Sequence, residues 1–229
     1  MPGNGRSVAV TGVGVVSPAG NDIATFWKRM VDGDTAIGPL RGVPTERLSC
    51  RLAAEVLDFQ PSHHFDRRQL PTLDRFSQFA VVAARQAISD SGLRLTDEER
   101  ENVAIIIGSG IGGINTLDES FLKLYGERAS RLHPLTIPKM MINGCACQVS
   151  MDLGLKGEAY TVASACASAT HAIGQAFRMI RAGAADVVLT GGSEACLNPG
   201  SIKAWEALRV MSDVACRQFS ANRCGLVLG

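Results

Sequence analysis

The stretch Tyr160-Thr-Val-Ala-Ser-Ala-Cys166-Ala-Ser-Ala-Thr-His171-Ala-Ile-Gly174 decides what fold and chemistry to expect of this chain. A short strand-like run, Tyr160 to Val162, passes through small residues into a cysteine, and an uncharged helical stretch follows at once. We therefore predict a strand-to-helix turn with Cys166 at the N-terminus of a buried helix. The unpaired N–H groups and the dipole of a helix N-terminus favour an anion such as a thiolate. This layout is that of a nucleophile elbow, with cysteine in place of serine.

The segments on either side of this stretch alternate between strand and helix patterns. The apolar runs 103–108 and 186–190 are typical of strands covered on both faces, and 7–16 is typical of a strand that ends in a glycine-rich turn. Further expected elements are a short strand over 52–56 and helices over 22–31 (capped by Asn21), 73–91, 115–125, 138–151 and 166–181. The alternation predicts an α/β fold with a mostly parallel sheet between covering helices.

Length and composition narrow the class of protein. The chain has 229 residues, 46% apolar and 20% charged, which fits one sizeable α/β domain or half of a larger one. Its net charge of +1 gives no general attraction to nucleic acid or membrane surfaces. No apolar run is long enough to span a membrane, and the N-terminus lacks the apolar region of a signal peptide. We therefore expect a soluble, cytoplasmic protein.

Cysteines, histidines and glycines give no sign of a metal or nucleotide site. The seven cysteines are odd in number, irregularly spaced and without a C-x-x-C pair, so we expect neither a disulfide framework nor structural zinc. Most of them are interpreted as small buried residues. The glycine-rich segments 11–14 and 108–113 follow predicted strands but fit no dinucleotide or Walker A pattern. They are interpreted as tight turns where backbone passes close to backbone.

A cysteine nucleophile needs a base, and the sequence offers no clear one. His171 lies five residues after Cys166, about 140° around a helix axis, so the two side chains would not face one substrate. We expect His171 to be a hydrogen-bonded core residue. His63, His64 and His133 lie in turn-rich segments and are poor candidates. The residues alone therefore leave two alternatives for Cys166, a nucleophile and a buried core cysteine.

The whole chain resembles one known family. Residues 161–174 are similar to the active-site signature of the β-ketoacyl-acyl-carrier-protein synthases, and four further stretches match that family in order and spacing: 8–20, 108–113, 184–194 and 216–229. The similarity is greatest to the elongating type II enzymes. Three stretches, 65–70, 146–155 and 203–208, resemble the rhizobial, nodulation protein E-like branch.

This resemblance implies a thiolase-like fold and an acyl thioester formed on Cys166. Malonyl-carrier protein would then be decarboxylated, and its carbanion would condense with the acyl group, in fatty acid or related acyl biosynthesis. The backbone N–H of Cys166 would donate to the developing oxyanion. The resemblance implies no cofactor and no metal.

The family pattern also assigns binding residues and partners. It implies that Ile111, Ser201 and Trp205 line the acyl-chain pocket, although simple core packing is an equal alternative for Ile111. It implies that Arg67, Arg68, Arg131 and Arg209 meet an acidic acyl-carrier protein, although a solvated charge is the default interpretation of any single arginine. A homodimer formed through the strand that precedes Cys166 is expected as well.

The chain departs from its family in length. Family members are about twice as long, and their second halves carry two catalytic histidines and a Phe-Gly loop, whereas this sequence stops at Gly229 inside a strand-like run. We therefore expect residues 1–229 to be the N-terminal domain with the C-terminal domain absent, as a truncated product, a cleaved fragment or one piece of a split enzyme. Such a chain would not catalyse condensation alone. The alternatives are a non-catalytic partner subunit akin to chain-length factors, and a thiolase-type acyltransferase that uses coenzyme A thioesters.

Overall fold

The computed structural model describes residues 6–229, so most of the N-terminal stretch used to argue against a signal peptide lies outside it. The chain divides into two compact units. Unit 1 comprises residues up to Gly14, Pro61–Gly113 and Pro134–Glu194; unit 2 comprises Val15–Gln60, Ile114–His133 and Ala195–Gly229. Within residues 6–229, no helix is both long and apolar enough to cross a lipid bilayer.

A three-stranded parallel sheet forms the centre of unit 1. Strand β3 (Ala104–Gly108) lies in the middle, with β4 (Ala159–Val162) on one side and β5 (Val188–Gly192) on the other. Ile106 is the partner of Tyr160 on β4 and of Thr190 on β5. Every residue of β3 is buried, because helices cover both faces of the sheet. The predicted strands over 103–108, 160–162 and 186–190 are therefore confirmed, with ends shifted by one or two residues.

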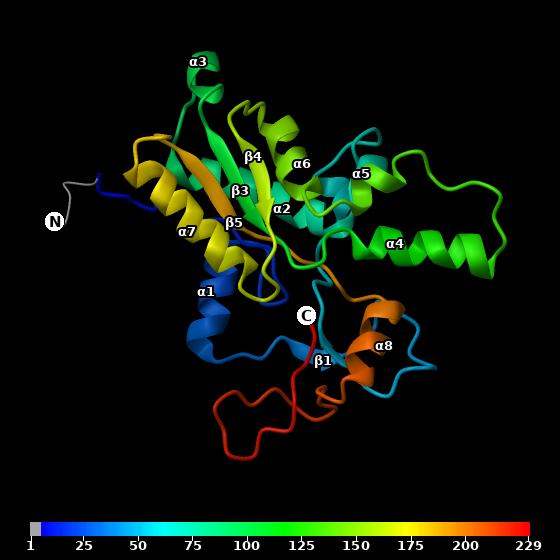
Figure 1. Cartoon of the computed structure of the whole chain (residues 1–229). Coiled ribbons are helices and arrows are strands. Elements are labelled where there is room, and N and C mark those ends of the chain that lie inside the picture. The colour runs from blue at the N-terminus through cyan, green and yellow to red at the C-terminus, as the bar shows by residue number, and fades with distance from the viewer. Residues whose placement is uncertain (1–5) are drawn as a thin grey trace. The chain divides into compact units, whose positions relative to one another are not determined.

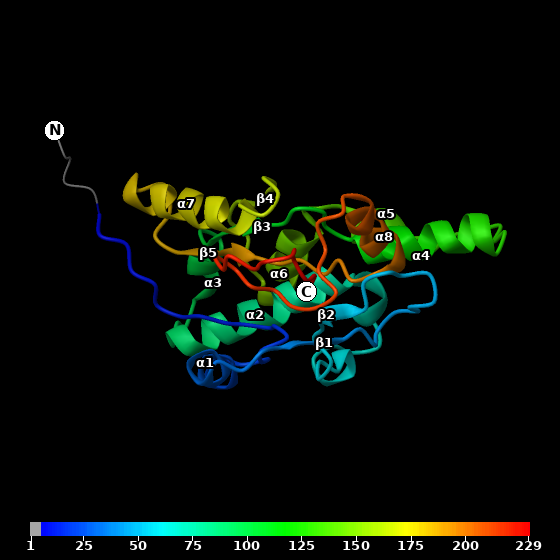
Figure 2. The same cartoon turned by 90° about the horizontal axis from the view of Figure 1, so that it is seen from below.

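Helices α7, α2 and α6 make unit 1 a three-layer sandwich. Helix α7 (Ser168–Arg181) packs on one face, and α6 (Gly144–Leu153) on the other, where α2 (Arg75–Ser91) packs against it (Figures 1 and 2). Ala172 and Ala176 of α7 bury themselves against Ile106, since small side chains let the helix approach the strand closely. The remaining helical segments of this unit are α3 (Asp97–Arg100), α5 (Thr136–Met140) and the 3-10 turns Pro61–His63 and Leu70–Thr72.

The predicted strand over 7–16 is wrong. Its described residues in unit 1 form no strand, and Gly12 and Gly14 instead lie against the backbone of α2. A Cβ would lie 2.2 Å from the carbonyl oxygen of Ala87 at Gly12, and 1.9 Å from that of Ala83 at Gly14. This close approach of backbone to backbone is what we expected of the 11–14 glycines.

Two predicted helices are each made of two pieces. The helix expected over 138–151 is divided into α5 and α6, because Met141 after α5 adopts an extended conformation. The helix expected over 115–125 belongs to unit 2, where α4 (Ile114–Phe121) continues into a π-helical turn, Leu122–Gly126. Helix α2 matches the prediction over 73–91 closely, since its N-cap Asp74 accepts a hydrogen bond from the N–H of Phe76.

Unit 2 contains a two-stranded sheet and has a hydrophobic core of its own. Strand β1 (Ile37–Pro39) pairs antiparallel with β2 (Leu52–Ala54), and α1 (Ile23–Asp32) and α8 (Pro199–Ala207) belong to this unit together with α4. The cap of α1 is Asp22, not the predicted Asn21, because the Asp22 carboxylate accepts the N–H of Thr25. The core consists of Leu40, Leu48, Ala53, Ile202 and Leu228.

Candidate active site

Cys166 lies on the turn between β4 and α7, and its side chain is exposed. The preceding residue, Ala165, has φ +52°, a left-handed conformation that costs a residue with a Cβ about 1–2 kcal/mol. Two hydrogen bonds close the turn, from Ala167 N–H to the Ser164 carbonyl (3.2 Å) and from Ser168 N–H to the Ala165 carbonyl (3.0 Å). The sharp strand-to-helix turn predicted for a nucleophile elbow is therefore present. Helix α7 begins two residues later than predicted, so Cys166 precedes its first turn.

The buried Ser168 side chain fixes the conformation of the elbow through two hydrogen bonds. Its Oγ accepts the N–H of Ser164 at 2.9 Å and donates to the carbonyl of Ala165 at 2.6 Å. Ser168 is only 4% exposed, so both hydrogen bonds are shielded from water. One side chain thus fixes the two residues that precede Cys166, Ser164 and Ala165.

Glycines at two strand ends form the seat of the elbow. A Cβ on Gly108, the last residue of β3, would lie 2.3 Å from the carbonyl carbon of Ser168. A Cβ on Gly192, the last residue of β5, would lie 2.5 Å from the Cβ of Ala169. The first turn of α7 therefore rests directly on the sheet, and Cys166 stands at the carboxyl ends of the parallel strands. Open α/β sheets commonly bind ligands at this edge.

The loop after β3 lies beside the elbow. A Cβ on Gly110 would lie 3.6 Å from the carbonyl oxygen of Ala165, so this loop passes close to the residue before Cys166. Ile111, the next residue, is 44% exposed. It is therefore not a core residue of unit 1, and the structure places it in the loop beside the elbow.

His171 is bonded to the elbow but is not a core residue. Its Nδ1 lies 2.6 Å from the Oγ of Ser164, so the expected hydrogen bond is present. The expectation of burial is wrong, because His171 lies on the exposed side of the first turn of α7. His63 and His133 are exposed, and His64 is half-buried.

The other two predicted pocket residues belong to unit 2 and have structural contacts there. Ser201 donates its N–H to the side chain of Asn198, the N-cap of α8, at 2.9 Å. Trp205 packs against the core of unit 2. The predicted arginines are all exposed, Arg67 and Arg68 in unit 1, and Arg131 and Arg209 in unit 2.

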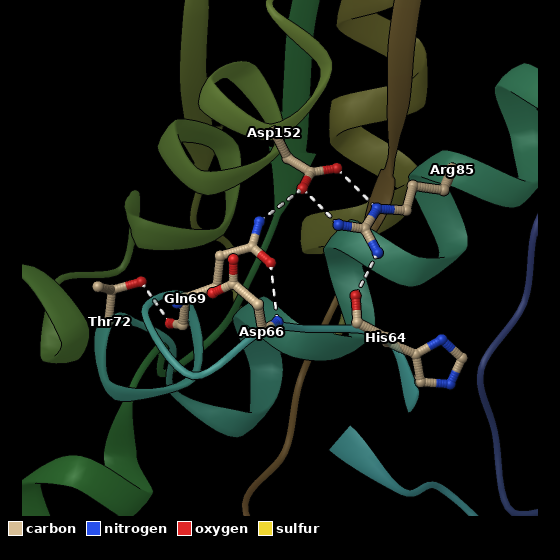
Figure 3. A network of polar contacts seen from close by, with 6 residues as sticks. All are labelled: His64, Asp66, Gln69, Thr72, Arg85 and Asp152. Atoms are coloured by element: carbon tan, nitrogen blue, oxygen red, sulfur yellow. Dashed lines mark hydrogen bonds and ion pairs between the residues drawn. The ribbon is translucent and has the colours of Figure 1, made fainter. Parts of the chain in front are cut away.

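A polar network between α2 and α6 was not predicted from the sequence (Figure 3). Arg85 forms two hydrogen bonds with Asp152, from Nε at 2.7 Å and from Nη2 at 2.5 Å, and donates a third to the His64 carbonyl at 2.7 Å. The Asp152 hydrogen bond raises the pKa of Arg85, so the guanidinium stays charged. Gln69, Arg68 and Asp152 also line a cavity of about 430 Å³ beside this network. Arg85 and Asp152 lie 67 residues apart in the sequence, so no local sequence pattern predicts that they interact.

The cysteines differ sharply in their surroundings. All seven are free; Cys50, Cys145 and Cys196 are buried, whereas Cys166 and Cys224 are exposed. The prediction that most of them are buried is wrong, because only three of the seven are buried and Cys147 and Cys216 are half-buried. Burial raises the pKa of the Cys145 thiol to about 11, which keeps it protonated at neutral pH. Cys145 is therefore a packing residue, whereas the Cys166 thiol is open to a reagent.

The family model for the β-ketoacyl synthase N-terminal domain matches residues 5–229. The chain therefore belongs to the β-ketoacyl synthase family, and the elbow at Cys166 coincides with the family signature identified in the sequence.

Individual relatives agree with this assignment. Nodulation protein E of Rhizobium sp. (strain N33) is 43% identical over 98% of this chain and 56% of its own length. The 3-oxoacyl-[acyl-carrier-protein] synthase 2 of Staphylococcus aureus (strain N315) is 36% identical over 98% of this chain and 55% of its own length. The chain thus spans about half the length of the curated relatives it matches.

Solved structures show the same fold. The ishigamide ketosynthase/chain length factor superposes with a TM-score of 0.89 at 25% identity, covering 97% of this chain and 56% of its own. A β-ketoacyl synthase from Burkholderia phymatum STM815 gives a TM-score of 0.82 at 25% identity, covering 95% and 55%. A type II PKS acyl-carrier protein in complex with its ketosynthase gives 0.82 at 27% identity, covering 98% and 56%. The fold is accordingly thiolase-like, as predicted.

Proposed function

We propose that this chain is the nucleophile-bearing, N-terminal domain of a 3-oxoacyl-[acyl-carrier-protein] synthase. The observation that carries the proposal is the exposed Cys166 thiol on a strained elbow above the glycine ends of β3 and β5. An exposed thiol between small neighbours leaves room for a thioester carbonyl to approach. Curated relatives named as 3-oxoacyl-[acyl-carrier-protein] synthases support the choice of reaction.

The proposed reaction has two stages. The Cys166 thiolate attacks the carbonyl of an acyl-carrier thioester, the bond to the carrier sulfur breaks, and the carrier leaves as a thiol after taking up a proton. Malonyl-carrier protein then loses carbon dioxide, and the resulting carbanion attacks the Cys166 thioester and expels the thiolate. The backbone N–H of Cys166 would donate to the oxyanion in both stages.

Condensation requires groups beyond those in this sequence. The family pattern places its two catalytic histidines and its second oxyanion donor in a C-terminal half. His171 is not one of them; its Nδ1 lies 2.6 Å from the Oγ of Ser164 within the elbow. We therefore propose that residues 1–229 accept the acyl group and that condensation needs the second half.

The proposed partners are an acyl-carrier protein and a second copy of the chain. Four exposed arginines, Arg67, Arg68, Arg131 and Arg209, offer positive charge to an acidic carrier surface. Strand β4 is at the edge of its sheet, with β3 as its neighbour on one side, so its other edge can pair with the same strand of a second copy. Ile111, Ser201 and Trp205 remain the proposed acyl-pocket residues, and a cytoplasmic location remains a prediction.

The test is transfer of an acyl group to Cys166. The full 229-residue chain is incubated with an acyl-acyl-carrier protein, and its cysteine peptides are measured by mass spectrometry. We expect the acyl mass on the Cys166 peptide, none after Cys166→Ala, and unchanged labelling after Cys224→Ala, which removes another exposed thiol. Absence of acylation at Cys166 would favour a non-catalytic partner subunit. Acylation by coenzyme A thioesters but not by carrier thioesters would favour a thiolase-type acyltransferase.

A second arm tests the need for the groups that the family pattern places in a C-terminal half. Malonyl-carrier protein is added to the acylated chain, with and without the C-terminal half of a family relative. We expect 3-oxoacyl product only in the presence of that half. Turnover by the 229-residue chain alone would contradict this part of the proposal.

A further inference from the structure

The loop after β3, which carries Ile111, is held by the carboxylate of Glu194, two residues after the end of β5. Glu194 Oε2 accepts the N–H of Gly110 at 2.7 Å and the N–H of Ile111 at 3.1 Å. The second oxygen, Oε1, lies 3.4 Å from the donating hydroxyl of Ser109. Three consecutive residues of the loop therefore donate to one side chain, which follows them by more than eighty residues.

The side chain of Glu194 is itself firmly based. Ser193, its neighbour, donates its N–H to the Gly108 carbonyl at 3.0 Å and its Oγ to the Phe76 carbonyl at 2.6 Å. These bonds tie the segment after β5 to β3 and α2. The carboxylate thus reaches the loop from a fixed position, and hydrogen bonds to a charged acceptor are about twice as strong as neutral ones.

The end of the loop that follows Ile111 has little freedom to move, because it is packed against neighbouring backbone. Ser109 is buried and its Oγ accepts the N–H of Gly112 at 3.1 Å. A Cβ on Gly112 would lie 2.8 Å from the Cα of Ile142, and one on Gly113 would lie 2.1 Å from the Lys139 carbonyl oxygen. The segment between these anchors, Gly110 and Ile111, is the part that depends on Glu194.

This segment lies between Glu194 and the elbow. A Cβ on Gly110 would lie 3.0 Å from Glu194 Oε2 and 3.7 Å from the Cα of Ala165. Moving the loop away from the carboxylate would therefore change the space beside Cys166 and the direction of the Ile111 side chain. No cation is bonded to the carboxylate among the contacts described for this unit; its partners are N–H and O–H groups of the loop.

We infer that Glu194 is a positioning residue that fixes Ile111 beside Cys166 and thereby sets which acyl chains the thiol accepts. The inference rests on the proposed function, because it takes Cys166 as the acyl acceptor. Glu194 touches no reacting atom. Its effect passes through the backbone of Gly110 and Ile111, and it is specific to substrates long enough to reach the Ile111 side chain.

The experiment compares the full chain with Glu194→Ala, Glu194→Gln and Glu98→Ala. Glutamine keeps one carbonyl oxygen for the two loop N–H groups, whereas alanine removes every acceptor. Glu98, an exposed carboxylate on α3 of the same unit, is the matched control. Cys166 acylation is followed by peptide mass spectrometry with a series of acyl-carrier proteins of increasing chain length. Unfolding curves confirm that each variant is folded.

We expect Glu194→Ala to change the ratio of long-chain to short-chain acylation rates by about tenfold, the size expected for lost charge-assisted hydrogen bonds. Glu194→Gln should restore most of the ratio, and Glu98→Ala should leave it unchanged. Equal rates for all chain lengths in Glu194→Ala and the parent chain would overturn the inference. A uniform loss of rate at every chain length would also overturn it, because that pattern indicates a merely structural role.

Hydrogen exchange separates this inference from the proposed function. The amides of Gly110 and Ile111 should exchange about tenfold faster in Glu194→Ala than in Glu194→Gln or the parent chain, whether or not Cys166 accepts an acyl group. If the parent chain is not acylated, the proposed function fails, and exchange alone decides whether Glu194 positions the loop. Unchanged exchange in Glu194→Ala would reject that positioning.

Discussion

Gly108 at the end of β3 lies against the backbone of Ser168, so closely that a Cβ would be 2.3 Å from the Ser168 carbonyl carbon. Real Cβ atoms are not found at such a distance, and the neighbour is backbone, which has no rotamer to change. The seat of the Cys166 elbow therefore depends on the absence of one methyl group.

Gly108→Ala should push α7 away from the sheet and lower the free energy of unfolding by roughly 3 kcal/mol, the upper end of the usual overpacking cost. Urea unfolding measures the loss. The matched control is Gly38→Ala in β1, where no atom lies within 4 Å of the added Cβ, and a change within about 0.5 kcal/mol is expected. Equal stability of the two variants would show that α7 does not rest on Gly108 as described.

The sequence predicts the elbow well because its signals are local. The apolar run 104–108, the small residues around Cys166 and the uncharged start of α7 can each be recognised within a few consecutive residues. The predicted strand over 7–16 fails for the opposite reason. Its alternating apolar residues suit a strand, but Gly12 and Gly14 fit closely against α2 instead of pairing with the sheet.

Contacts between distant residues are invisible to a reading of patterns. Nothing in the residues around Glu194 indicates that it accepts hydrogen bonds from a loop that includes Gly110, 84 residues earlier in the chain. The break between α5 and α6 is also not visible in the pattern: Met141 adopts an extended conformation there, and the first residue of α6, Gly144, is buried where a Cβ would lie 3.1 Å from the Pro138 carbonyl oxygen. Such features depend on how distant segments pack together, and a pattern of neighbouring residues does not reveal that packing.

The Arg85–Asp152 pair gives a second prediction. Asp152→Asn removes the charge that three donors approach, and it should lower the free energy of unfolding by roughly 2–3 kcal/mol. The expected cost is below that of a fully buried pair, because 34% of the Arg85 side chain is exposed. The double variant Arg85→Met with Asp152→Asn should lose less than the sum of the single changes. Strict additivity in this double-mutant cycle would contradict a direct interaction.

Cys145 predicts a pH dependence of stability. Burial raises its pKa from 9.0 to about 11, so in the folded chain the thiol holds its proton where the unfolded chain has lost it. Stability from this group is fully present below pH 9 and is lost as the pH rises toward 11, by about 2 kcal/mol at pH 11. Unfolding curves at pH 8 and pH 10.5 should differ less in Cys145→Ala than in the parent chain. An identical pH dependence in both would mean that Cys145 is not the responsible group.

The left-handed conformation of Ala165 gives the last prediction. Glycine in place of alanine usually lowers the free energy of unfolding by about 0.5–1 kcal/mol, because the unfolded chain gains freedom. At φ +52°, however, removing the Cβ also relieves strain of about 1–2 kcal/mol. Ala165→Gly should therefore leave the free energy of unfolding unchanged or raise it by up to about 1 kcal/mol.

The matched control is Ala163→Gly, two residues earlier, where alanine is exposed and does not have a positive φ. Only the usual loss of about 0.5–1 kcal/mol is expected there. Because glycine also frees the turn, Ala165→Gly should slow acylation of Cys166 while Ala163→Gly changes it little. A parallel loss of stability in both variants would show that Ala165 is not strained, and the elbow would then owe its shape to Ser168 alone.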